Sequence, residues 1–212
     1  MVARCYIAGA GDFFSGELPR KGDYIIAADG GYVELVARGY KPDIVVGDFD
    51  SLGGIPQHNN VLSSPTEKDD TDMMLAVKHG LERGCTEFII NGGLGGRFDH
   101  TLANLQVLSY ISRSKAQGVL VGRDVCITSV SNGSISFMTG ASGRVSVFCA
   151  GDKAEGVTLS GMKYTLDEAR LTLDDPLGVS NEFTGAPAVI TVRKGTLLVV
   201  WTDGLDMLDG DI

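Results

Sequence analysis

The sequence has few of the residues that build disulfide frameworks, zinc sites or histidine-dependent hydrolases. Its four cysteines, Cys5, Cys85, Cys126 and Cys149, lie far apart without a CxxC pair, and the 212 residues include only three histidines. Three of the cysteines fall in apolar runs, so we interpret all four as buried small hydrophobic residues rather than zinc ligands or disulfide partners. A Ser/His/Asp hydrolase has no support either, because no nucleophile accompanies a histidine.

Basic residues are also scarce. Eighteen lysines and arginines face 27 aspartates and glutamates, which gives a formal net charge of -9. This balance argues against nucleic acid or an anionic membrane as a partner. No apolar stretch is long enough to span a bilayer, and the first residues lack the pattern of a secretion signal. We therefore expect a cytoplasmic protein.

The first part of the chain alternates short apolar runs with helical patterns. Apolar residues recur every three or four positions over 70–83 and 101–114, and a shorter helix is predicted over 31–38. Strands are predicted over 4–8, 24–28, 44–46, 61–63, 87–91 and 118–121. This alternation predicts an α/β domain over residues 1–131, with a mostly parallel, Rossmann-like sheet flanked by helices. Ligands of such sheets bind beyond the carboxyl ends of the strands.

From residue 132 onward, short strands separated by turn signals replace the helical patterns. Strands are predicted over 134–138, 144–150, 156–159, 169–173, 188–192 and 196–201. A hairpin turn is predicted at Arg193-Lys194-Gly195-Thr196, between the last two. The pattern indicates a smaller all-β sandwich domain over residues 132–212.

Two aspartate clusters carry the strongest chemical signal. Asp48 and Asp50 follow a buried strand, and alternation points both to one side. The segment Glu67-Lys68-Asp69-Asp70-Thr71-Asp72 precedes the helix predicted from residue 70. Turn formation explains the first cluster equally well, and capping by Asp70 or Thr71 explains part of the second. Such carboxylates suit a magnesium ion that carries phosphates, with Asp48, Asp50 and Asp72 as candidate ligands.

A glycine-rich segment, Asn91-Gly92-Gly93-Leu94-Gly95-Gly96-Arg97-Phe98-Asp99-His100, joins a predicted strand to a helix. Its glycines let main-chain amides approach an anion, and Arg97 could bind phosphate oxygens. It is neither a P-loop nor a GxGxxG motif, and Gly9-Ala10-Gly11 also fails the latter. A flexible turn is the alternative, with Asp99 as the helix N-cap. Together with the aspartates, the segment indicates a nucleotide-dependent phosphotransfer enzyme.

Two further segments are compatible with the same site but are weak on their own. Asp29-Gly30-Gly31 follows the second predicted strand at the same sheet edge, where it could contact ribose or metal-bound water or form a tight turn. Ser180-Asn181-Glu182 lies between predicted strands and has the composition of a turn.

Taken in order, these segments resemble the thiamine pyrophosphokinase (thiamine diphosphokinase) family. The resemblance extends from Asp29 to Glu182 and so covers most of the chain. It implies an α/β catalytic domain followed by a β-sandwich, assembled as a homodimer with the site at the subunit interface. It also implies Mg²⁺, ATP and thiamine as ligands, with thiamine diphosphate and AMP as products.

The resemblance also implies residue roles. Asp48, Asp50, Asp72 and Arg97 are expected to be catalytic, and Ser180 and Asn181 to bind the pyrimidine end of thiamine. The residues expected around the nucleotide and its metal are Asp29, Gly30, Gly31, Lys68, Asp69, Thr71, Gly96, Asp99 and His100. Trp201 is either an aromatic contact to thiamine or a core residue.

In the expected mechanism, the thiamine hydroxyl attacks the β-phosphorus of ATP and expels AMP, with Mg²⁺ and Arg97 stabilising the charge. Two alternatives remain open from sequence. One is a different ATP-dependent phosphotransferase or a phosphohydrolase that uses the same acids. The other is a non-catalytic binder of thiamine diphosphate or a nucleotide.

Overall fold

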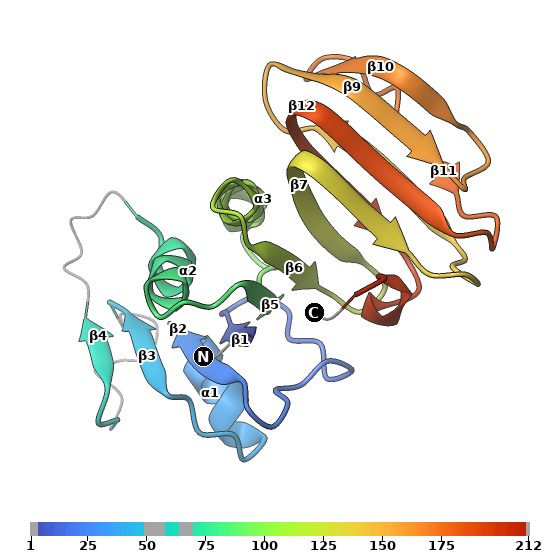
Figure 1. Cartoon of the computed structure of the whole chain (residues 1–212). Helices are drawn as coiled ribbons and strands as arrows, with labels where there is room; N and C mark the ends of the chain where they lie inside the picture. Colours follow the sequence, from blue (N-terminus) through green and yellow to red (C-terminus); the bar gives the residue numbers. More distant parts are fainter. Residues whose placement is uncertain (1–3, 49–57, 64–69, 211–212) are drawn as a thin grey trace. The chain divides into compact units, whose positions relative to one another are not determined.

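The computed structural model describes residues 4–48, 58–63 and 70–210 (Figure 1). Within these residues there are twelve strands and three α-helices, which makes this a mixed α/β protein. The chain divides into two compact units, Met1–Val107 with Leu120–Arg123, and Leu108–Val119 with Asp124–Ile212. None of the helices in the described ranges is sufficiently long and apolar to cross a membrane.

The N-terminal unit is organised around parallel strands in the order β5-β1-β2-β3-β4. All five residues of β1 are buried, which fits a central strand covered on both faces. The strands are β1 (Arg4–Ala8), β2 (Tyr24–Ala28), β3 (Ile44–Gly47), β4 (Val61–Ser63) and β5 (Glu87–Asn91), with β6 (Gln117–Val121) next to β5 in the strand order. Each agrees with its predicted range to within one residue.

Three helices connect these strands: α1 (Gly31–Ala37), α2 (Asp72–Glu82) and α3 (Phe98–Arg113). Thr71 is the N-cap of α2, and its side chain accepts a hydrogen bond from the Met74 N–H. The α2 helix ends before Gly84, whose φ of +84° lets the chain turn away. The α3 helix begins three residues before the predicted start, so Asp99 lies in its first turn and is not the N-cap.

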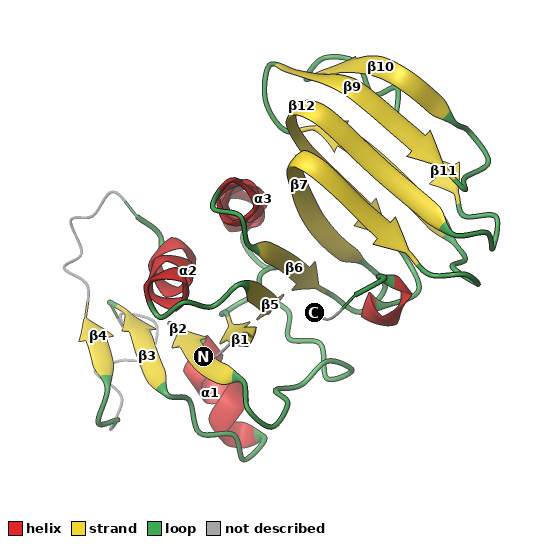
Figure 2. Ribbon diagram, viewed as in Figure 1, coloured by secondary structure: helices red, strands yellow, loops and turns green. Residues whose placement is uncertain are grey.

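The described part of the C-terminal unit is antiparallel, and its only helix beyond the end of α3 is a short 3₁₀ turn, η2 (Leu205–Met207) (Figure 2). The strands are β7 (Cys126–Phe137), β8 (Arg144–Cys149), β9 (Lys153–Ser160), β10 (Leu166–Thr172), β11 (Asn181–Glu182) and β12 (Ala188–Trp201). Over its length β12 pairs with β7, whereas its first half also pairs with β9 and its second half with β8. The short strand β11 replaces the turn expected around Asn181.

The predicted hairpin at Arg193–Thr196 is wrong. β12 runs through it as one strand with a register shift between Val192 and Thr196. Gly195 has φ +116° there, and its N–H donates to the Asn132 side chain at 2.9 Å. The glycine therefore forms a bulge, because pairing with β7 on both sides of it keeps the strand continuous.

Trp201 is a core residue. Its side chain is fully buried at the end of β12, and its ring packs edge-on against Phe137 with centroids 5.5 Å apart. The indole Nε1–H donates to the Gly204 carbonyl at 2.7 Å. These contacts satisfy both its apolar ring and its polar group.

Candidate active site

A pocket of about 440 Å³ opens at the carboxyl ends of β1, β2, β3 and β5. This volume falls within the range of small-molecule sites. The residues that line it are Gly9, Ala10, Gly11, Ala28, Asp29, Asp48, Asp70, Thr71, Asp72, Met73, Gly92, Gly93, Gly95, Gly96, Arg97, His100, Ala103 and Asn104. All belong to the N-terminal unit.

The pocket lies where the strand order reverses. After β1 the chain continues to β2 on one side, while β5 occupies the other side of β1. Such a switch point leaves a crevice beyond the strand ends. The segments that follow β1 and β5, Gly9–Gly11 and Gly92–Gly96, both line this crevice.

Glycine is required where these two segments meet. The Gly11 N–H donates to the Gly92 carbonyl, and the Asp12 N–H donates to the Leu94 carbonyl, at 2.7 and 2.8 Å. Gly92 has φ +70°, and a Cβ on it would lie 2.4 Å from the Gly9 carbonyl oxygen. Any side chain at position 92 would therefore separate the two segments or distort the main chain.

Among the described residues, four aspartates line the pocket: Asp29, Asp48, Asp70 and Asp72. Capping does not account for them, because Thr71 already caps α2. Asp70 instead forms an ion pair with Lys78 of the same helix, at 2.5 Å. Asp72 lies in the first turn of α2, where the helix dipole favours a negative charge. The pocket thus gathers four carboxylates, none of which is the side-chain cap of α2.

Arg97 supplies positive charge at the pocket rim. Its guanidinium forms two hydrogen bonds with the Asp99 carboxylate, at 3.2 and 2.5 Å, and both side chains are largely exposed. These bonds lower the pKa of the Asp99 carboxyl and raise the pKa of Arg97. Both groups are therefore charged at neutral pH, and Arg97 can exchange its exposed partner for an anionic ligand.

The pocket's oxygen donors suit magnesium. No three His, Cys, Asp or Glu side chains in the ranges 4–48, 58–63 and 70–210 are grouped so as to hold a metal ion. Magnesium, however, commonly takes one or two protein carboxylates and completes its shell with water and ligand oxygens. Asp48 and Asp72 both line the pocket and provide that number. The donor set therefore fits a magnesium ion that enters together with an anionic ligand.

Seven of the residues expected to be catalytic or to surround the nucleotide and its metal line the pocket together: Asp29, Asp48, Thr71, Asp72, Gly96, Arg97 and His100. Gly30 and Gly31 do not line the pocket. A Cβ on Gly31 would lie 2.0 Å from the Ala8 carbonyl oxygen, so this glycine lets α1 approach β1. Asp99 contacts Arg97 and does not line the pocket. Asp50, Lys68 and Asp69 lie outside the described residues.

Ser180 and Asn181 belong to the C-terminal unit. The Asn181 side chain is 3% exposed, accepts from the N–H groups of Tyr164 and Glu182, and donates to the Tyr164 carbonyl. Ser180 is exposed and has φ +62°, a conformation rare for a non-glycine residue. Asn181 therefore ties the main chain that follows this serine to Tyr164.

Sequence reasoning missed several pocket residues. Gly9-Ala10-Gly11 was dismissed because it lacks the GxGxxG spacing, yet it lines the crevice opposite the second glycine segment. Asn104 is buried on α3 and donates from Nδ2 to the Gly93 carbonyl at 2.7 Å. The only sequence signal for Asn104 was a polar residue on the apolar face of a predicted helix.

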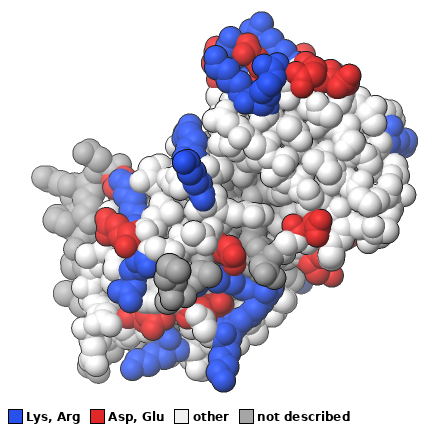
Figure 3. Space-filling model, viewed as in Figure 1, with Lys and Arg blue, Asp and Glu red and all other residues white. Residues whose placement is uncertain are grey.

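The surface around the N-terminal unit carries mixed charge. On the face drawn in Figure 3, Lys and Arg side chains are interspersed with Asp and Glu and form no large patch of one sign there. Among the described residues that line the pocket, aspartates outnumber Arg97.

Comparisons with known proteins agree with this arrangement. The family model "Thiamin pyrophosphokinase, catalytic domain" matches residues 16–120, and "Thiamin pyrophosphokinase, vitamin B1 binding domain" matches residues 138–197. Thiamine pyrophosphokinase of Bacillus subtilis (strain 168) is 29% identical over 182 residues, covering 82% of this chain and 85% of that protein. Thiamin pyrophosphokinase 1 of Caenorhabditis elegans is 26% identical over 208 residues, covering 89% and 84%.

Solved structures give the same result. The crystal structure of thiamine pyrophosphokinase from Bacillus subtilis superposes with a TM-score of 0.82 at 26% identity, covering 95% of this chain and 100% of that chain. A thiamin pyrophosphokinase family protein from Enterococcus faecalis gives a TM-score of 0.78 at 26% identity, covering 96% and 100%. By sequence, by both family models and by fold, the chain belongs to the thiamine pyrophosphokinase family.

Proposed function

We propose that the protein transfers a diphosphoryl group from ATP to the hydroxyl of thiamine, giving thiamine diphosphate and AMP in a magnesium-dependent reaction. The observation that carries this proposal is the pocket at the β1/β5 switch point. It combines two glycine segments, several aspartates and Arg97 within the part of the chain that matches the catalytic family model. Glycine segments suit polyphosphate binding, and the aspartates suit the accompanying metal.

Each group in the pocket has a proposed task. Main-chain amides of Gly92–Gly96 bind phosphate oxygens beside the close-packed segment Gly9–Gly11, and Arg97 neutralises charge on the transferred group. Asp48 and Asp72, with Asp50, would hold magnesium directly or through water, and the ion would neutralise phosphate charge there. Little covalent chemistry is needed from the protein if the attacking and leaving oxygens are held in line.

The thiamine end of the reaction is proposed for the C-terminal domain. We assign residues 1–131 to a Rossmann-like, ATP-binding catalytic domain and residues 132–212 to a thiamine-binding β-sandwich. The two family-model matches, residues 16–120 and 138–197, support this division. Ser180 is the proposed contact to the pyrimidine end of thiamine, with Asn181 holding it in place through the Tyr164 main chain. A cytoplasmic homodimer with the site at the subunit interface completes the proposal.

A product assay tests the function. The purified protein is incubated with thiamine, ATP and Mg²⁺, and nucleotides and thiamine phosphates are separated by chromatography. Controls omit thiamine, omit ATP, or add a chelator. AMP and thiamine diphosphate in equal amounts, formed only with metal, are the expected result.

The other outcomes lead to different functions. ADP with thiamine monophosphate would indicate ordinary kinase chemistry at the same site. Inorganic phosphate without a phosphorylated thiamine would indicate a phosphohydrolase. Tight binding of ATP or thiamine diphosphate without any product would refute catalysis and favour a binding protein.

A further inference from the structure

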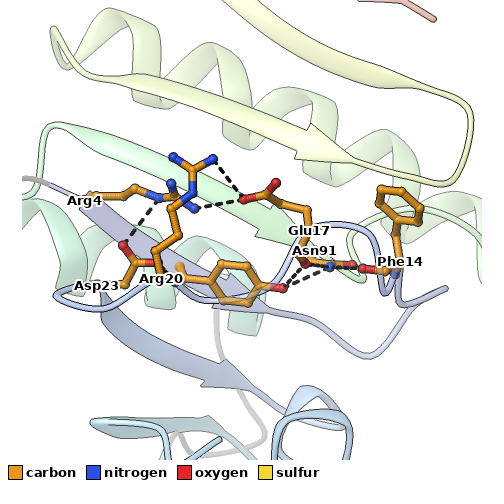
Figure 4. A network of polar contacts seen from close by, with 7 residues as sticks. Arg4, Phe14, Glu17, Arg20, Asp23 and Asn91 are labelled. Carbon is orange, nitrogen blue, oxygen red and sulfur yellow. Dashed lines mark hydrogen bonds and ion pairs between the residues drawn. The ribbon is translucent and has the colours of Figure 1, made fainter. Parts of the chain in front are cut away.

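Asn91 is the last residue of β5 and is fully buried, although the rest of that strand's interior is apolar. Its Oδ1 accepts from the Phe14 N–H at 2.8 Å, and its Nδ2 donates to the Phe14 carbonyl at 2.8 Å. The same Nδ2 also lies 2.9 Å from both the Glu17 carbonyl and the Tyr6 hydroxyl, so its two protons are shared among three acceptors. Figure 4 shows this side chain within the polar network, next to Phe14.

Only a carboxamide can make this set of contacts at this position. Its acceptor and its two-proton donor lie side by side, as the N–H and C=O of a peptide group do, so it pairs with both polar groups of Phe14. A carboxylate could accept from Phe14 but would face two carbonyl oxygens without a donor. An apolar side chain would leave buried main-chain groups unpaired.

The contacts join two parts of the chain that line the pocket. Asn91 directly precedes the segment Gly92–Gly96, and its own carbonyl accepts from the Gly9 N–H at 2.7 Å. Its side chain holds Phe14 and Glu17, which follow the segment Gly9–Gly11. Asn91 therefore holds the chain on both sides of the segment Gly9–Gly11. Its main chain bonds to Gly9, and its side chain bonds to Phe14 and Glu17.

Tyr6 and Arg4 also hold Glu17 in place. The Tyr6 hydroxyl donates to the Glu17 carbonyl at 2.9 Å, and burial raises the pKa of Tyr6, which keeps this donor protonated. Arg4 donates to the Glu17 carboxylate at 3.0 Å, with both side chains mostly buried (Figure 4). Glu17 is thus held through its main chain and its side chain, and Asn91 connects this anchor to the pocket.

We propose that Asn91 is a positioning residue for nucleotide binding: its side chain sets the two glycine segments at the spacing that the phosphates of ATP require. It touches no substrate in this role and acts through Gly9–Gly11 and Gly92–Gly96. The inference rests on the proposed function, and it names a residue that determines the affinity for ATP without affecting the affinity for thiamine.

The test compares Asn91→Asp and Asn91→Ala with Phe88→Leu. Phe88 lies on the same strand, is fully buried and does not line the pocket, so its truncation controls for a general loss of stability. Steady-state rates are measured with ATP and thiamine varied separately. The assay temperature is kept well below the thermal unfolding midpoint of every variant. We expect kcat/KM for ATP to fall about ten- to a hundredfold in the Asn91 variants, because small misplacements of binding groups cost this much. The KM for thiamine and all constants of Phe88→Leu should stay within about threefold of the wild type.

Hydrogen–deuterium exchange of the segment 9–17 gives a second readout. The Phe14 amide should exchange faster in Asn91→Ala than in wild type, because this variant removes the acceptor of the Phe14 N–H. ATP should protect the segment in wild type only. Should the Asn91 variants fold poorly, Tyr6→Phe removes one acceptor of Asn91 and one donor to Glu17, and a smaller change in the same direction is expected. The inference is overturned if exchange is unchanged, or if kinetics for ATP change no more than in Phe88→Leu.

The two proposals fail in different ways. A wild-type protein that makes no thiamine diphosphate refutes the proposed function, and the exchange experiment with ATP alone then decides the role of Asn91. ATP protection that Asn91→Asp abolishes supports the inference. Equal protection in wild type and variant, or none in either, overturns it.

Discussion

Replacing Asp72 by asparagine separates the chemistry of the pocket from the stability of α2. Thr71 already caps the helix, and the Asp72 carboxylate in the first turn interacts favourably with the helix dipole. Its loss should cost about 0.3–1 kcal/mol of unfolding free energy. If the carboxylate holds the metal on the transferred phosphates, turnover should fall about 10²–10³-fold, which corresponds to about 2.7–4 kcal/mol of transition-state stabilisation. The effect on catalysis should therefore greatly exceed the effect on folding.

The assay measures thiamine diphosphate formation at saturating ATP and thiamine over a range of Mg²⁺ concentrations, with urea denaturation of the same preparations. Glu82→Gln is the matched control, because it makes the same chemical change on the same helix but at the end away from the pocket. Its turnover should equal that of the wild type. The reasoning is refuted if Asp72→Asn keeps turnover within about threefold of wild type at saturating Mg²⁺, or if Glu82→Gln loses as much.

Three further predictions follow from local geometry. Gly92→Ala should lower the thermal unfolding midpoint much more than Gly84→Ala, because both have positive φ but only the Cβ at position 92 would meet the main chain; equal shifts would contradict this. Burial and, secondarily, the charge of Arg83 lower the pKa of His79 in the folded protein. The stability that neutral His79 contributes is therefore present above pH about 6.5, the unfolded pKa, and is lost as the pH falls through the lower folded pKa. Urea midpoints at pH 7.5 and 5.5 should therefore differ less in His79→Asn than in wild type. Asn181→Ala leaves three main-chain groups unpaired and should destabilise the protein by about 1–3 kcal/mol, measured by urea denaturation; a loss under about 0.5 kcal/mol would contradict the assigned contacts.

The sequence predicted the N-terminal strands and helices well because their signals are local. Apolar periodicity marked α2 and α3, and runs of buried residues marked β1 and β5. Errors at helix ends were small and had identifiable causes. The predicted start of α2 was two residues early because Thr71, rather than an aspartate before it, caps the helix.

The all-β part was harder to predict because pairing between distant strands overrides local turn signals. Gly195 looked like a hairpin residue, but pairing with β7 on both sides makes it a bulge within β12. Asn181 looked like a turn residue, but it pairs with β8 in a short strand, and its side chain is buried and bonded to Tyr164. Neither partner is close in sequence to the residue that it constrains.

The same distinction applies to the site. Residue types alone determined that the chain carries carboxylates suited to magnesium and a glycine segment suited to phosphate, because these are chemical properties of the side chains and of glycine. The strand order decided that Gly9–Gly11 lies against Gly92–Gly96, since only the pairing of β1 with β5 brings them together. Burial decided the role of Asn91, whose partners lie 74 to 85 residues away along the chain. Chemistry is encoded residue by residue, whereas the distances between reacting groups exist only once distant strands have paired.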